Sequence, residues 1–222
     1  MEDVYYRADV DCNDIGTIFS VLEKSIIKNG YMSEKYDENN TKYFKSRRVN
    51  KNMKFVKKAV DKISKLYELI AFNRSNIDWL NREYNYIDNK GIHCVYISII
   101  LKLILEEKLK EKRIDFVQGV VAFDHNDSAA MLFGKHAVQF HAWCTIDDKV
   151  LDCTFVPQQR KFSKCSFDNL YILGVFPKDL SYVGHVESDR IVQKYINDFL
   201  QINHFTKEEW ISKFKELLKI DK

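Results

Sequence analysis

The stretch from Val95 to Leu105 most constrains how this chain can fold, because it is apolar almost without interruption. No polar face recurs in it at helical spacing, so we expect a helix over residues 94–107 that is covered on most sides. With Lys102 inside it, the run is too short to cross a bilayer. The helix must therefore lie at the centre of a fold that packs other elements around it.

The rest of the chain predicts an α+β arrangement around this helix. Further helices are expected at residues 15–28, 52–72, 77–84, 189–202 and 207–220, the last with a capping box formed by Thr206 and Glu209. Strands are expected at residues 114–123, 137–146 and 149–156, with a loop at 125–134. Helices followed by antiparallel strands are typical of an α+β fold.

This order of elements suggests three regions. We expect a helical N-terminal segment at residues 1–75 packed on the core, a core with the buried helix and an antiparallel sheet at 76–185, and C-terminal helices at 186–222. No internal repeat or low-complexity linker separates them.

The last two strands can form a hairpin with a defined register. A two-residue turn at Asp147-Asp148 pairs Ile146 with Lys149. His141 then lies diagonal to Asp152 on one face of the sheet, within reach of a side-chain contact. A three-residue loop would move Asp152 to the other face. The hairpin can therefore present a carboxylate to an imidazole.

Cys94 lies at the expected N-terminus of the buried helix, three residues after Gly91. Unpaired amides and the helix dipole favour a thiolate at this position. The backbone N–H of Cys94 could also donate to a developing oxyanion, with Asn89 or Trp79 as candidates for the second donor. A thiol, an imidazole and a carboxylate in this chain order are the parts of a cysteine acyl-transfer site.

Four short motifs together resemble the transglutaminase-like branch of the papain-like cysteine enzymes. They are Gly91 to Cys94, Phe116-Val117-Gln118-Gly119, His141-Ala142-Trp143 and Leu151-Asp152-Cys153-Thr154. The match covers roughly residues 75–156, about a third of the chain. It departs from the family at two positions: His93 stands directly before the cysteine, and Cys153 stands where the family often has proline.

The resemblance implies a papain-like core and a role for each residue of the triad. Cys94 would be the nucleophile, His141 the general acid and base, and Asp152 the carboxylate that orients the imidazole, with Trp143 beside the substrate. Family members cleave amides, deamidate glutamine or cross-link amines to acyl groups. We favour hydrolysis, because water is always available. No cofactor is required, and residues 1–40 show no calcium-loop pattern.

Two alternatives to an enzyme remain open. The soft ligands of the chain could hold a structural zinc, although the compact Cys-x-x-Cys pairs typical of such sites are absent. The candidate ligands are His93, Cys94, His141, Cys144, Cys153 and Cys165. The chain could also be a non-catalytic binding protein that keeps the fold. The other histidines, His125, His136, His185 and His204, are interpreted as structural or surface groups on loops or near helix ends.

Charge is unevenly distributed along the chain, although the net charge is only +3. From Lys42 to Lys65 all but one of the charged residues are basic, the exception being Asp61. This block is either the solvated face of a helix, which we favour, or a contact surface for an acidic partner. Nucleic acid is not expected, because no base-reading motif accompanies the block.

The cysteines and the N-terminus bear on the compartment. Five cysteines at wide spacing do not form a disulfide framework. The acidic start Met1-Glu2-Asp3-Val4 lacks the features of a secretory signal. A cytoplasmic protein that acts on peptide or protein amides, without a membrane, is the expectation.

Overall fold

The computed structural model describes residues 41–73, 93–124, 136–162, 169–178 and 180–219. In these ranges the protein is α+β, as the sequence predicts, with an antiparallel sheet of six strands. The helices expected at 15–28 and 77–84 and the loop at 125–134 lie outside the described residues. No helix in the described ranges is long and apolar enough to cross a membrane.

The sheet has the strand order β1-β6-β2-β3-β4-β5, and every neighbouring pair is antiparallel. Its strands are β1 (Thr41–Phe44), β2 (Ile114–Asp124), β3 (His136–Ile146), β4 (Lys149–Asp152), β5 (Ile172–Leu173) and β6 (Leu180–Val186). The long strands β2 and β3 pair along their whole length, from Ile114 opposite Ile146 to Asp124 opposite His136. They form the rigid centre on which the site is built.

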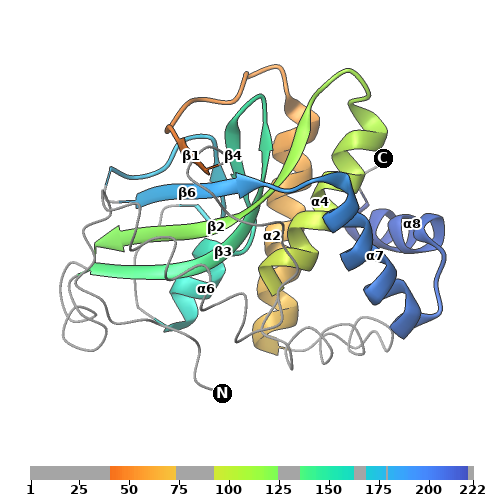
Figure 1. The fold of residues 1–222 in the computed structure, drawn as a ribbon. Helices are drawn as coiled ribbons and strands as arrows, with labels where there is room; N and C mark the ends of the chain where they lie inside the picture. Colours follow the sequence, from red (N-terminus) through yellow and green to blue (C-terminus); the bar gives the residue numbers. More distant parts are fainter. Residues whose placement is uncertain (1–40, 74–92, 125–135, 163–168, 179, 220–222) are drawn as a thin grey trace.

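Helices gather beside this sheet, with α4 in the middle of them (Figure 1). The described helices are α2 (Lys54–Asn73), α4 (His93–Lys108), α6 (Phe155–Phe162), α7 (Asp189–Asn203) and α8 (Lys207–Leu218). α4 contacts β2, β3, α2, α7 and α8. The prediction of a central helix covered on most sides is therefore confirmed.

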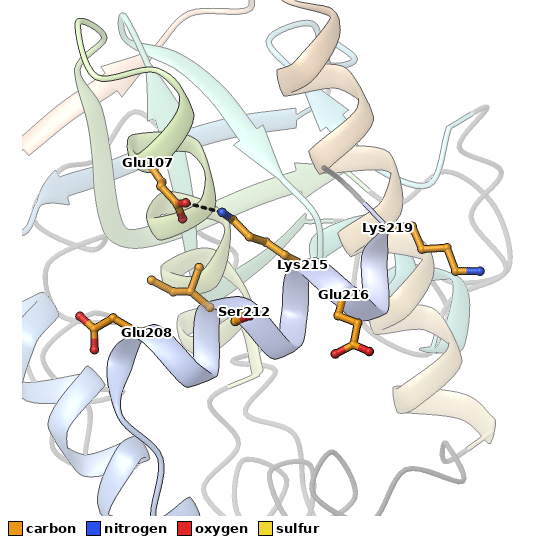
Figure 2. A pocket seen from close by; sticks show the side chains of 7 residues that line it. Glu107, Glu208, Ser212, Lys215, Glu216 and Lys219 are labelled. Carbon is orange, nitrogen blue, oxygen red and sulfur yellow. Dashed lines mark hydrogen bonds and ion pairs between the residues drawn. The ribbon is translucent and has the colours of Figure 1, made fainter. Parts of the chain in front are cut away.

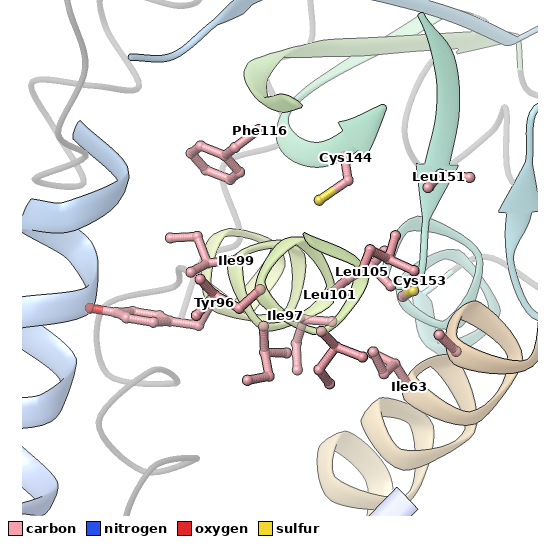
Figure 3. Packing of buried hydrophobic residues seen from close by; sticks show 14 of the residues in the cluster. Ile63, Tyr96, Ile97, Ile99, Leu101, Leu105, Phe116, Cys144, Leu151 and Cys153 are labelled. Carbon is pink, nitrogen blue, oxygen red and sulfur yellow. The ribbon is translucent and has the colours of Figure 1, made fainter. Parts of the chain in front are cut away.

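Figure 3 shows α4 nearly end-on, with Phe116 and Cys144 of the sheet on one side and Ile63 of α2 on another. Every residue of α4 from Cys94 to Leu105 is buried, which explains why the helix shows no polar face. Lys102 is the charged exception. Its ammonium donates to the carbonyl of Ile114 at 2.6 Å and pairs with Glu106, so the buried charge is satisfied where α4 meets β2.

α2 shows why the basic block has a helical pattern. Val56, Ala59, Val60 and Ile63 are buried against the core, while the lysines between them lie on the outer side. Burial of one apolar face against the neighbouring helices stabilises a helix whose charged face remains in water. The interpretation of the block as a helix face is confirmed for residues 54–65.

Two parts of the predicted chain path differ from the structure. β1 and β6 were not predicted; β1 comes from the segment expected to be helical and pairs with β6. The return strand ends at Asp152 instead of residue 156, and Phe155 and Val156 belong to α6. The strand ends there because the Asp152 carboxylate accepts from the backbone N–H groups of Thr154 and Phe155, which bends the chain into α6.

The C-terminal helices follow the prediction closely. α7 and α8 begin at the expected residues, and Thr206 and Glu209 form the capping box. His204 lies between them in a left-handed conformation and is exposed. His185 differs from its interpretation as a loop residue, because it lies on β6 and is buried.

Candidate active site

A tight turn between β3 and β4 positions two polar side chains. Asp147 and Asp148 have φ angles of 49° and 59°, as a two-residue hairpin turn of type I′ requires. The turn pairs Ile146 with Lys149, Thr145 with Val150 and Cys144 with Leu151. This is the predicted register, and it places His141 diagonal to Asp152. Nε2 of His141 lies 2.8 Å from Oδ2 of Asp152.

The Asp152 carboxylate is fully buried and accepts several hydrogen bonds. Oδ1 accepts from the backbone N–H groups of Thr154 at 2.9 Å and Phe155 at 3.0 Å. Oδ2 accepts from the phenol of Tyr182 at 2.9 Å, in addition to its contact with His141. These donors fix the carboxylate in one orientation and stabilise its negative charge.

The two buried partners shift the pKa of each other. Burial raises the pKa of Asp152, but the charge and hydrogen bond of His141 and the two backbone donors outweigh burial and hold the pKa below its usual value. Burial lowers the pKa of His141, but Asp152 and Cys94 outweigh burial and raise this pKa to about 10. At neutral pH the pair is therefore a carboxylate and an imidazolium.

Cys94 is the second residue of α4 and is 3% exposed. The first turn of a helix leaves its backbone N–H groups without intrahelical acceptors. Ser98, one turn later, donates to the carbonyl of Ala142, so this end of α4 lies against β3 beside His141. The Cys94 thiol accordingly contributes to the raised pKa of the imidazole.

The two nitrogens of His141 face different partners. Nε2 is engaged by Asp152, and Thr154 Oγ1 lies 3.4 Å from the same atom. Nδ1 is buried and has no hydrogen-bond partner of ordinary length. Because Nε2 is occupied, Nδ1 is the nitrogen available for proton exchange with the Cys94 thiol. The structure thus brings together Cys94, His141 and Asp152, the three residues selected from the sequence.

Trp143 lies under this group and is fully buried. Its indole stacks with the ring of His141 at a centroid distance of 6.4 Å. A Cβ atom added to Gly119 or Gly184 would lie 2.9 Å or 2.8 Å from Trp143 Cη2, so the indole needs glycine at both positions. In this structure Trp143 supports His141 from the core and offers no exposed surface to a substrate, unlike the expected place beside one.

The remaining predicted donors and ligands fall outside this arrangement. Asn89 and Trp79 lie outside the described residues, as does Cys165. Cys144 donates its thiol to the carbonyl of Ser98 and Cys153 to that of Val60, and burial raises the pKa of both. Within the described ranges no three His, Cys, Asp or Glu residues form a group that could hold a metal ion.

Two surface hollows lined by described residues lie away from this site. One, of about 650 Å³, lies along α8, where Lys215 forms an ion pair with Glu107 (Figure 2). Glu107 is near the end of α4 opposite to Cys94, so this hollow is about 20 Å from the thiol along the helix. The triad itself is enclosed in the core.

Sequence reasoning missed the residues that hold Asp152. Tyr182 comes from β6, a strand that was not predicted, and nothing local marks it as a partner of Asp152. Thr154 and Phe155 had a readable signal, since an aspartate commonly binds the N–H groups two and three residues later. Pro157 in the first turn of α6 would have supported a helix start there.

Comparison with known proteins adds no relative: no family model, no curated protein and no solved structure matches this chain. The class of the molecule therefore rests on its own structure. The structure defines an α+β protein with a buried cysteine at the N-terminus of its central helix, next to a buried pair of His141 and Asp152 whose side chains lie 2.8 Å apart.

Proposed function

We propose that this protein is a cysteine-dependent enzyme that acts on amide bonds through Cys94, His141 and Asp152. The observation that supports this proposal most is the fully buried pair of His141 and Asp152, whose free nitrogen faces the helix end that carries Cys94. A histidine with a purely structural role in a core is usually neutral. The pKa of His141, in contrast, is raised by Asp152 and Cys94, which favours the imidazolium beside the thiol. A positive charge in that position favours a thiolate.

The reaction would proceed in two halves. The Cys94 thiolate attacks the amide carbonyl and forms a tetrahedral intermediate, to whose oxyanion the Cys94 backbone N–H can donate a hydrogen bond. The C–N bond then breaks as His141 gives its proton to the leaving amine, which leaves a thioester on Cys94. His141 next accepts a proton from a water molecule as the water oxygen attacks the thioester carbonyl. The C–S bond then breaks, which releases the carboxylic acid product and regenerates Cys94.

Asp152 contributes by orientation and charge. Its bond to Nε2 keeps the imidazole in one position and stabilises the imidazolium of the first half-reaction. An amine in place of water would give a transamidation product. We favour hydrolysis, since excluding water requires a dedicated apolar passage. Cys94 is 3% exposed, so little of its surface is open to a substrate in this structure.

The test is alkylation by iodoacetamide across pH, with each cysteine mapped by mass spectrometry. Cys144 and Cys153 serve as internal controls, because they are as deeply buried as Cys94 but have no imidazole partner. We expect Cys94 to react fastest near neutral pH and to lose this advantage in His141→Gln. Equal rates at the three cysteines would contradict the proposal.

A second measurement separates an enzyme from a non-catalytic relative with the same fold. Wild type and Cys94→Ser are incubated with glutamine-containing peptides, with and without an added amine, and products are identified by mass. Loss of ammonia or peptide cleavage in wild type alone supports hydrolysis, and incorporation of the amine supports transfer. A reactive Cys94 without any product from amide substrates would favour the binding protein.

A further inference from the structure

The basic block from Lys42 to Lys65 carries ten cations and one acid, and some of these cations have partners within the protein. Lys42 pairs with Asp148, and Lys65 pairs with Asp61 at 2.8 Å. Lys62 donates to the carbonyl groups of Leu218 and Lys219, where it caps the end of α8. The ammonium groups of these three lysines therefore already have partners within the protein.

Other cations of the block have no such role. They make no side-chain hydrogen bond or ion pair in the part of the chain that the structure describes, and all are exposed; they are Lys45, Arg47, Arg48, Lys51, Lys54 and Lys57. Six positive charges without an ion pair among the described residues, within thirteen consecutive positions, create a strong local potential, which attracts anions and repels other cations.

A hollow of about 630 Å³ is lined by three of these cations, Lys51, Lys54 and Lys57. Lys58 also lines it, and Asp61, the one acid among the described residues of its wall, is already paired with Lys65. The hollow also has an apolar side, formed by Val49, Met53, Tyr171 and Leu173. Apolar surface surrounded by cations suits a ligand that carries both carboxylates and an apolar group.

The walls of the hollow are held in place by the fold. Arg47 donates its backbone N–H to the carbonyl of Gly174 at 2.8 Å, and Gly174 donates to Val150 at 2.7 Å, which ties the basic segment to β5 and β4. The backbone N–H groups of Asn52 and Met53 bind Asn50 at 3.0 Å each. A preformed hollow reduces the ordering cost of binding.

The start of α2 adds to the positive potential. No acidic residue lies in its first turn, and three of its first five residues are lysines, namely Lys54, Lys57 and Lys58. Cations near a helix N-terminus oppose the helix dipole, so this arrangement is unfavourable in the free protein. A bound anion relieves the repulsion, which makes an acidic ligand favourable for the helix as well as for the lysines.

We infer that this hollow, lined by Lys51, Lys54 and Lys57, is a docking site for an acidic protein segment that carries an aliphatic or aromatic side chain among its carboxylates. The carboxylates pair with the lysines, and the apolar side chain packs on Met53, Tyr171 and Leu173. A phosphodiester backbone supplies charge but no apolar group, and no base-reading motif accompanies the basic block, so we take a protein segment as the occupant. This inference goes beyond the proposed function, and binding here does not require Cys94.

The test uses fluorescence anisotropy of the full chain with a fluorescein-labelled peptide of glutamates interrupted by one leucine. We expect saturable binding that weakens as salt is added and weakens at least severalfold when serine replaces the leucine. K54E/K57E should lose about tenfold or more in affinity. Both substitutions place acids in the first turn of α2, where they favour the helix, and circular dichroism checks that the fold remains.

The matched control is K194E/K207E, which changes the net charge equally on α7 and α8, away from the hollow. This variant should bind the peptide like wild type. Equal losses in both variants, no binding by wild type, or tighter binding of oligothymidylate or phosphatidylserine vesicles than of the peptide would each overturn the inference. Cys94→Ser should bind normally, so a failed peptide assay leaves the proposed chemistry to its own test.

Discussion

The phenol of Tyr182 donates a 2.9 Å hydrogen bond to Oδ2 of Asp152, the same oxygen that contacts Nε2 of His141. Tyr182 lies on β6 and Asp152 ends β4, with β2 and β3 between these strands in the sheet. Both side chains are buried. The bond therefore joins two strands that do not pair with each other, and it does so at the carboxylate on which the candidate site depends.

Removal of this phenol should destabilise the protein. Tyr182→Phe takes away a donor to a buried carboxylate, and we expect the free energy of unfolding at pH 7 to fall by about 2 kcal/mol. Urea denaturation measures the change. Tyr171→Phe, at a half-buried position, is the control and should change stability by less than about 0.5 kcal/mol. Equal effects of the two substitutions would show that the Tyr182 bond contributes nothing specific.

The pair of His141 and Asp152 should make stability depend on pH. The pKa of His141 is about 10 in the folded protein and near 6.5 in the unfolded chain, so the folded state binds this proton more tightly. Its contribution is complete below pH 6.5 and is lost as pH rises toward 10, by up to about 1.4 kcal/mol per pH unit. Urea unfolding between pH 6 and 10 measures the slope.

His141→Gln provides the comparison for this slope. Glutamine cannot take up the proton, so the variant should be less stable at pH 6 and its stability should change less between pH 6.5 and 10. A wild-type stability that is constant over this interval would show that the imidazole of the folded protein is neutral at pH 7.

Gly119 should not tolerate a side chain. A Cβ atom there would lie 2.2 Å from the carbonyl oxygen of Val183 and 2.9 Å from Trp143 Cη2. Since the first contact is with backbone, β2 and β6 would have to separate, and we expect Gly119→Ala to cost about 3 kcal/mol. Thermal unfolding measures the loss. Ser181→Ala on β6 should change the melting temperature little, and a melting temperature for Gly119→Ala near that of wild type would contradict the proposed contact.

The β3–β4 turn offers a stabilising substitution. Asp148 has a φ of 59°, a conformation that costs about 1 kcal/mol for most residues and that glycine adopts freely. Asp148→Gly should therefore raise the free energy of unfolding by about 0.5 kcal/mol, because aspartate tolerates this conformation better than most residues and the exposed ion pair with Lys42 contributes little. Asp148→Ala also removes the ion pair but keeps the strained backbone, so it should give no gain. Similar results for both variants would point to charge instead of backbone conformation.

Local pattern predicted the elements that depend on neighbouring residues. The central helix, β2, β3 and the two C-terminal helices lie within two residues of their expected bounds, because apolar spacing and capping residues act over a few positions. The β3–β4 register was also predictable. A two-residue turn at Asp147-Asp148 leaves one pairing that puts the apolar residues of β3 on the α4 side.

β6 and the end of β4 depend on contacts that sequence spacing does not reveal. β6 lies between β1 and β2, far from both in sequence, and its partners are selected by long-range pairing. β4 ends at Asp152 because that carboxylate binds the next backbone amides as well as Tyr182 and His141. A strand pattern that continues to residue 156 cannot show this competition.

The sequence by itself determined the candidates Cys94, His141 and Asp152, together with the helix and hairpin that carry them, because helix position and hairpin register follow from local pattern. Only the tertiary structure decided that Trp143 supports the imidazole from the core on Gly119 and Gly184, and that Tyr182 holds the carboxylate. It also separated the lysines that cap and pair from those that surround the hollow. Burial and charge at these positions arise from segments distant in the chain, and their energies exist only once those segments pack together.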